Sequence, residues 1–299
     1  KRVKPDAFIL GEVWHDGLDW LRGDQFDSVM DYPWRDATLA WLTGRVDARG
    51  YDRWLTRLRF RYSAEANRGL VRMLSTHDTP RVRTVVGSRE RAALGAVLLL
   101  TAEGVPMIYY GDEVGLDGGP DPDCRRCYPW NDEEPRDLGL LSLYRRLGRI
   151  RRAFPWLNDG AWETVRAEGD ILAYRRLPVP LHVRRGAHPE GPARSSPSAE
   201  EAGLLVVLNR GAGPARVTLP PAPEPAGGWV DLLAGEMLAG EVQAGEVQAG
   251  EMQAGEMPAD QSASDRGTGS RPGQGRTLLL PACGAAILAP ARLAEEVGV

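Results

Sequence analysis

Cysteine, long apolar segments and an excess of positive charge are all scarce or absent in this chain of 299 residues. Three cysteines are too few for a disulfide framework, which favours a reducing compartment, and we therefore expect a cytoplasmic protein. The longest strongly apolar stretch, Leu94 to Ala102, is far shorter than the roughly 20 residues that span a bilayer. Residues 1–6 lead into only a short apolar run, so we expect neither a secretory signal nor a membrane partner.

The charge balance of the chain is slightly acidic. There are 37 Lys and Arg residues against 41 Asp and Glu residues, which gives a formal net charge of −4. A general nucleic-acid binder carries a basic stripe or a strongly basic domain, so we expect no nucleic-acid partner. What the chain does have is ordinary globular composition, with 42% apolar and 26% charged residues, and a length typical of about two domains.

Short apolar runs alternate with helical patterns over residues 1–155. The runs that predict β-strands are Ala7–Leu10, Ser28–Met30, Leu70–Leu74 and Val105–Tyr110. Helices are predicted at Trp34–Leu42, Asp52–Tyr62, Arg89–Leu100 and Leu140–Phe154. Strands that alternate with helices predict βαβ units and a parallel sheet. A (β/α)8 TIM barrel needs eight strands and about 250 residues, so only half a barrel fits here.

The pattern changes after residue 155. Residues 156–299 carry short β-rich segments without long helical patterns between them, which predicts a small antiparallel β-sandwich domain. The β-rich segments are Trp162–Val165, Ile171–Tyr174, Leu204–Leu208, Val217–Leu219, Thr277–Leu280 and Ala286–Leu288. The predicted fold class is therefore α/β, with the C-terminal half of a TIM barrel followed by this β domain.

Two stretches interrupt the β-rich region, and we expect both to be disordered inserts. The first, at about residues 178–203, is rich in Pro, Gly, Ser and Arg. The second, at about residues 239–276, holds most of a tandem pentapeptide, Ala-Gly-Glu-Met/Val-X, that runs in five copies from Ala234 to Pro258. Neither a helix nor a strand gathers the Met and Val residues of this repeat on one face, and five copies are too few for a stacked solenoid.

Polar side chains follow the first and the third predicted strand. Glu12 comes after the first run, and His77 with Asp78 comes after the third. The carboxyl ends of barrel strands carry the chemistry of such folds, and a pair of carboxylates suits glycoside hydrolysis. The apolar neighbours Val13 and Trp14 would desolvate the carboxyl group of Glu12, as a general acid requires. Taken singly, a Glu at a strand end is more often solvated, and His-Asp before Thr-Pro is often a turn and a helix cap.

Five longer segments together resemble the α-amylase family of glycoside hydrolases. They are residues 8–15 (FILGEVWH), 20–30 (WLRGDQFDSVM), 77–81 (HDTPR), 104–113 (GVPMIYYGDE) and 121–125 (DPDCR). Within the family, the sequence most resembles the C-terminal portion of the cyclomaltodextrinase, neopullulanase and maltogenic amylase group. The resemblance implies a retaining hydrolase of α-1,4-glucosidic bonds in cyclomaltodextrins, maltooligosaccharides or pullulan, with transglycosylation.

The resemblance also implies roles for individual residues. Glu12 would be the general acid/base, and Asp78 would be the carboxylate that stabilises the transition state. His77 would contact the sugar at the cleavage point, and Trp14 would line the leaving-group side. The loop at residues 121–125 would bind the non-reducing side of the substrate. The substrate-binding residues implied in this way are Trp14, His77, Arg81, Asp121 and Arg125.

We find no counterpart of the family's nucleophilic Asp in this sequence. Family members carry it in a Gly-X-Arg-X-Asp segment upstream of the acid/base Glu, whereas only eleven residues precede Glu12, and Arg22-Gly23-Asp24 follows it. We therefore expect the chain to be a fragment that is inactive and aggregation-prone on its own. The alternatives are another α-amylase relative, such as an α-glucosidase, and a non-catalytic carbohydrate-binding remnant.

No cofactor or metal is expected in this chain, and any calcium would belong to an N-terminal part. Cys124 and Cys127 form a Cys-X-X-Cys pair, but zinc needs two further ligands and Cys283 is far away in the sequence. Prolines surround the pair where a redox motif would open a helix, so we interpret the pair as structural. Relatives often have an N-terminal β domain that builds a dimer, which makes a homodimer one expectation for a full-length protein.

Overall fold

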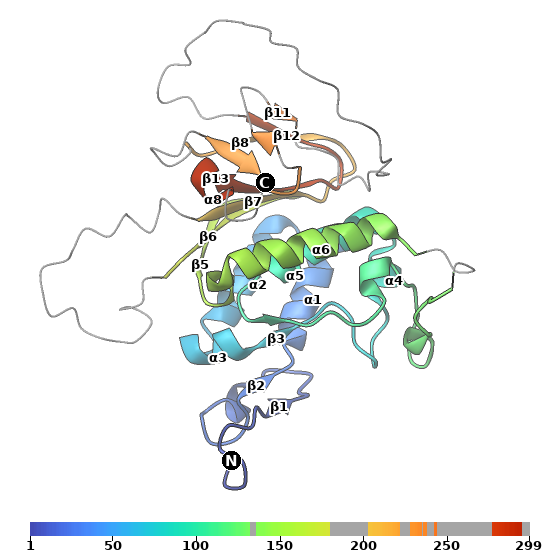
Figure 1. The fold of residues 1–299 in the computed structure, drawn as a ribbon, viewed down its shortest axis with the longest axis vertical. Helices are drawn as coiled ribbons and strands as arrows, with labels where there is room; N and C mark the ends of the chain where they lie inside the picture. The colour runs from blue at the N-terminus through green and yellow to red at the C-terminus, as the bar shows by residue number, and fades with distance from the viewer. Residues whose placement is uncertain are drawn as a thin grey trace, which may run out of the picture.

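The computed structural model describes most of the chain (Figure 1). The described residues are 1–131, 136–179, 203–221, 228–234, 236–237, 242–243 and 277–294. The predicted insert at 178–203 lies outside them from residue 180 to residue 202. The predicted insert at 239–276 lies outside them except for Val242–Gln243, so disorder in both inserts stays a prediction.

Four short parallel strands follow one another in chain order. They are β1 (Leu10–Gly11), β2 (Ser28–Val29), β3 (Val71–Arg72) and β4 (Val105–Pro106). β1 pairs with β2 and β3 pairs with β4, and a single bridge between Met30 and Val71 joins the two pairs. Each strand lies within one of the predicted apolar runs or continues it by one residue, and the parallel pairing is the one that the alternation with helices predicts.

Helices connect these strands and cover them. They are α1 (Tyr32–Leu42), α2 (Ala48–Arg59), α3 (Ala64–Gly69), α4 (Val82–Val86), α5 (Arg89–Thr101) and α6 (Leu138–Ala153). Single 3-10 turns are η1 (Leu18–Trp20), η2 (Asp112–Val114), η3 (Asp123–Arg125) and η4 (Pro155–Asn158). The four predicted helices correspond to α1, α2, α5 and α6. None of the described helices combines the length and the apolar composition needed to cross a bilayer.

Polar side chains at the helix starts explain where the longer helices begin. The Asp31 carboxylate accepts a hydrogen bond from the backbone N–H of Trp34 at the start of α1. Ser88 caps α5 in the same way, because its hydroxyl accepts from the Arg91 N–H. Such caps satisfy amide groups that have no partner within the helix.

Two β-sheets follow the helices in the sequence. Their strands are β5 (Ala161–Glu168), β6 (Ile171–Leu177), β7 (Leu204–Asn209), β8 (Ala215–Thr218), β9 (Trp229–Asp231), β10 (Glu236–Met237), β11 (Val242–Gln243), β12 (Thr277–Leu280) and β13 (Ala285–Pro290), and α8 (Ala291–Ala294) follows. The larger sheet is antiparallel with the order β10-β9-β13-β7-β6-β5. The smaller sheet has the order β11-β12-β8.

The larger sheet packs against the helices on one face and against the smaller sheet on the other (Figure 1). The helices, the larger sheet and the smaller sheet thus form three layers. Alternate residues of a strand point to opposite faces. Accordingly, Val206 and Leu208 of β7 share a core with α5 and α6, whereas Leu205 and Val207 share a second core with β8 and β12. The helices therefore lie between the parallel strands and the antiparallel sheets, and α5 is buried over almost its whole length.

Candidate active site

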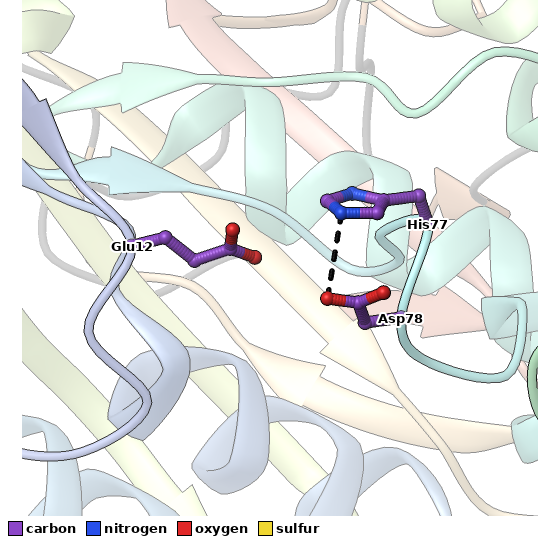
Figure 2. A group of neighbouring side chains, drawn as sticks. All are labelled: Glu12, His77 and Asp78. Atoms are coloured by element: carbon purple, nitrogen blue, oxygen red, sulfur yellow. Dashed lines mark ion pairs between the residues drawn. The ribbon is translucent and has the colours of Figure 1, made fainter.

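Glu12, His77 and Asp78 converge at the carboxyl ends of two parallel strands (Figure 2). Glu12 follows β1 directly, and His77 and Asp78 lie in the turn that follows β3. One donor atom from each of the three side chains lies within 4.8 Å of the others. Residues that are far apart in the sequence are thus brought together at the end of the sheet where α/β barrels carry their chemistry.

Tyr32 positions the Glu12 side chain. Its hydroxyl donates a hydrogen bond of 3.0 Å to Glu12 Oε1, and it lies 3.4 Å from the hydroxyl oxygen of Thr76. The Tyr32 residue is only 1% exposed. Burial raises the pKa of Tyr32 to about 12, so the phenol stays protonated and remains a donor at neutral pH. The sequence assigns Tyr32 no role in the site, because its hydrogen bond to Glu12 exists only in the folded chain.

Trp14 provides an aromatic wall beside Glu12. Its ring stacks on that of Tyr32, with 4.2 Å between the centroids and 13° between the planes. Trp14 is nevertheless 51% exposed, so part of the indole remains open to a ligand. Aromatic rings can bind the apolar face of a sugar by such contacts.

Glu12 is exposed, which corrects the expectation that its apolar neighbours bury it. Val13 packs against the small core around Val29 instead, and Trp14 packs on Tyr32. Neighbouring side chains in an extended segment point to opposite sides, so apolar neighbours in sequence need not cover the carboxyl group.

Arg125 fixes the His77–Asp78 turn. Its Nη2 donates to Asp78 Oδ1 at 2.9 Å, and its Nε donates to the His77 carbonyl oxygen at 2.9 Å. Asp121 Oδ1 lies 2.7 Å from the same Nε and completes the cluster. His77 Nε2 is 3.4 Å from the second oxygen of Asp78. The loop at residues 121–125 therefore orients Asp78, in addition to any contact that Asp121 and Arg125 make with a ligand.

Cys124 belongs to this same support. Its buried thiol lies 3.0 Å from the His77 carbonyl oxygen and donates to it. Cys127 is exposed, and both residues are free thiols, as is Cys283. The contact fits a structural role for Cys124, whereas a structural role for the exposed Cys127 stays a prediction.

Arg81 is fully buried, so direct contact with a substrate does not fit its position in this structure. Its Nη1 donates to the Tyr110 carbonyl oxygen at 2.6 Å and lies 3.4 Å from Asp112 Oδ1. Its guanidinium carbon lies 4.5 Å and 4.8 Å from the ring centroids of Tyr109 and Tyr110. The sequence prediction of a substrate contact is corrected here: Arg81 supports the loop after β4 from inside.

The donor types of Glu12, His77 and Asp78 are also those that hold zinc. Among the described residues, they are the group of this kind whose donor atoms lie close together. Each carboxylate already accepts a hydrogen bond, from Tyr32 and from Arg125 respectively. This environment suits the hydroxyl groups of a bound sugar, and the expectation of no metal stays a prediction.

Comparisons with known proteins agree on one family. The family model described as "Alpha amylase, catalytic domain" matches residues 1–156. The chain is 42% identical over 178 residues to a cyclomaltodextrinase of Thermoanaerobacter pseudethanolicus. The matched region covers 59% of this chain and 31% of the relative. The chain is also 38% identical over 242 residues to neopullulanase 2 of Thermoactinomyces vulgaris, and this match covers 79% of this chain and 37% of the relative.

A solved structure extends the likeness to nearly the whole chain. The crystal structure of Ttha1563 from Thermus thermophilus superposes with a TM-score of 0.71 at 28% sequence identity, covering 97% of this chain and 54% of that protein. The chain spans about a third of the length of the two curated relatives.

Proposed function

This chain belongs to the α-amylase family of glycoside hydrolases, with its TIM-barrel-type fold, and from that membership we propose that it supplies the acid/base side of a retaining active site for α-1,4-glucans. The observation that carries the proposal is the convergence of Glu12, His77 and Asp78. Residues 1–155 would be the second half of the catalytic barrel, and residues 156–299 its C-terminal β-sandwich domain.

Glu12 is the proposed general acid/base. The hydrogen bond from Tyr32 engages Oε1, which leaves Oε2 to carry the proton that a departing glycosidic oxygen needs. The exposed part of the Trp14 ring lies beside this carboxyl group and would stack on the sugar that leaves. The space over the exposed part of the Trp14 ring would also let a second sugar, in place of water, accept the glycosyl group. That reaction is transglycosylation.

Asp78 and His77 are the proposed partners of the sugar at the cleavage point. Arg125 and His77 hold the Asp78 carboxylate between them, so its orientation is set before a ligand arrives. A carboxylate fixed in this way can accept hydrogen bonds from sugar hydroxyls and stabilise the positive charge that develops on the ring.

The nucleophile would come from a segment outside this chain. A retaining mechanism needs it about 5 Å from the acid/base. Asp78 lies close to that distance from Glu12, so a second candidate is that Asp78 itself attacks the sugar. We favour the first proposal, because Arg125 and His77 engage the two oxygens of Asp78 and thereby reduce its nucleophilicity.

Cyclomaltodextrins, maltooligosaccharides and pullulan are the proposed substrates. Support comes from the names of the two curated relatives, cyclomaltodextrinase and neopullulanase 2. The three free thiols support a cytoplasmic location. A homodimer of a complete protein rests on the resemblance to the family alone.

Incubation of purified 1–299 with cyclomaltodextrin separates the two candidates. The favoured proposal predicts no turnover above a Glu12→Gln control. Turnover that Glu12→Gln removes, together with a sugar trapped on Asp78 by a slow glycosyl fluoride and located by mass spectrometry, would overturn it in favour of Asp78 as the nucleophile.

A further inference from the structure

A cavity of about 480 Å³ lies between α2, α3 and β5. Its volume is typical of pockets for small ligands. The residues on which the argument rests are Arg59, Phe60, Arg68, Glu103, Asp159 and Trp162. We propose that this cavity is a non-catalytic site that binds a segment of a neutral α-glucan chain; the choice of ligand rests on the function proposed above.

The cavity lies at the opposite ends of the strands from Glu12. Arg68, in α3, and Glu103 lie just before β3 and β4, which begin at Val71 and Val105. Glu12 and Asp78, in contrast, follow the carboxyl ends of β1 and β3. A sugar bound in the cavity is therefore out of reach of the proposed acid/base, so this site would hold a glucan without cleaving it.

Two aromatic residues, Phe60 and Trp162, line the cavity. Phe60, at the end of α2, is 88% exposed. Trp162 stacks on Tyr174, with 3.7 Å between centroids and 12° between planes. The Arg59 guanidinium carbon also lies 5.7 Å from the Trp162 ring centroid, so Tyr174 and Arg59 together fix this ring in the cavity wall. The exposed Phe60 ring is therefore the aromatic surface that can cover a ligand. Aromatic surfaces of this kind suit the apolar faces of sugar rings.

The charged side chains that line the cavity form ion pairs, and Glu103 is shared with Arg72 behind the wall, whose Nη2 lies 3.1 Å from Glu103 Oε1 and whose Nε lies 3.4 Å from Asp31. Arg59 Nε lies 3.6 Å from Glu103 Oε1, and Arg68 Nη1 lies 4.0 Å from Asp159 Oδ2. Two cations and two anions leave no net charge for an ionic ligand to neutralise. Alternating N–H donors and carboxylate acceptors do suit hydroxyl groups, which donate and accept hydrogen bonds. The balance favours a neutral polyhydroxylated ligand over an anion.

Hydrogen–deuterium exchange of the chain with maltoheptaose tests the proposal site by site. We expect the sugar to slow exchange over residues 56–68. Phe60→Ala should raise the maltoheptaose concentration that gives half of the maximal protection of these residues about fivefold to tenfold, because a stacking contact is lost. Trp54→Ala is the matched control: Trp54 is a partly exposed aromatic on the same helix that does not line the cavity, and its replacement should leave this protection unchanged.

The remaining outcomes distinguish the two proposals. Protection confined to residues 12–15 and 76–81 would overturn the cavity site and leave the proposed active site standing. Protection at neither segment would count against both. Protection over residues 56–68 that sodium sulfate reproduces, or that Phe60→Ala does not weaken, would also overturn the proposal, because the cavity would then bind an anion or bind without its aromatic rim.

Discussion

Tyr32 holds the proposed acid/base, Glu12, through a single hydrogen bond. Its phenol is buried, stays neutral because burial raises its pKa to about 12, and donates to one oxygen of Glu12. Asp31, next to it, is occupied differently: it caps α1 and lies 3.4 Å from Arg72 Nε. The adjacent residues therefore serve the site and the fold separately.

In a protein that joins this chain to the proposed nucleophile segment, Tyr32→Phe should lower kcat on cyclomaltodextrin by about 10- to 100-fold, since a hydrogen bond to a charged group is lost. Tyr51→Phe is a matched control, because Tyr51 is also buried but bonds to Thr38 away from the site. Steady-state kinetics and thermal melting of both variants check this. Equal effects on kcat would contradict a specific role for Tyr32.

Asp112 should make the chain less stable as the pH rises. Burial raises its pKa from 3.8 to about 7, and Arg81 opposes this only in part. Between about pH 4 and pH 7, Asp112 therefore keeps a proton in the folded state that it has released in the unfolded state. The free energy of unfolding falls as the pH rises through this range. Asp112→Asn should flatten this part of a plot of Tm against pH. An unchanged slope would contradict the assignment.

At the scale of elements, capping residues set the starts of helices that packing then stabilises. Ser88→Ala should cost about 1 kcal/mol of unfolding free energy, because the Arg91 N–H loses its partner. Urea denaturation measures this loss. Ser142→Ala, at an exposed position inside α6, should change stability by much less, and an equal loss there would argue against the cap.

The elements that could be predicted from sequence are those with a strong local pattern. α6 is recognisable because Leu140, Leu143 and Leu147 recur on one helical face, and they are indeed buried. α3 and α4 were missed because a helix of one or two turns is too short to show this periodicity. β9, with three residues, is defined by its pairing with β13 and not by its own sequence.

The same contrast applies to the site. Glu12, His77 and Asp78 could be singled out because each follows a strand in a recognisable motif. The support from Tyr32 and the burial of Arg81 could not, because both depend on contacts between segments that only the folded chain brings together.

At the scale of the whole molecule, the parallel sheet has two open edges. Within the described residues, β1 pairs only with β2 and β4 only with β3. Apolar side chains along these edges are exposed, among them Phe8, Leu10, Val105 and Ile108. Unpaired strand edges and exposed apolar groups promote association between chains.

The isolated chain should therefore self-associate, and light scattering should show it. Leu10→Lys combined with Ile108→Lys should reduce the scattering, because charge at the edges opposes pairing. Trp130→Lys, at an exposed aromatic in the loop before α6, should have little effect. Equal reduction by both sets of changes would show that association is a property of general hydrophobicity and not of the open edges.

The role of Glu12 as proton donor is the central claim. The most direct test compares hydrolysis of cyclomaltodextrin with that of α-maltosyl fluoride, by a protein that joins this chain to the proposed nucleophile segment and by its Glu12→Gln variant. Fluoride leaves without a proton, so the variant should lose turnover of cyclomaltodextrin and still release an initial burst of about one fluoride per active site. Continued release should slow, because hydrolysis of the glycosyl-enzyme needs the same group as its base. A variant that keeps its activity on cyclomaltodextrin, or that releases no burst of fluoride, would contradict the account.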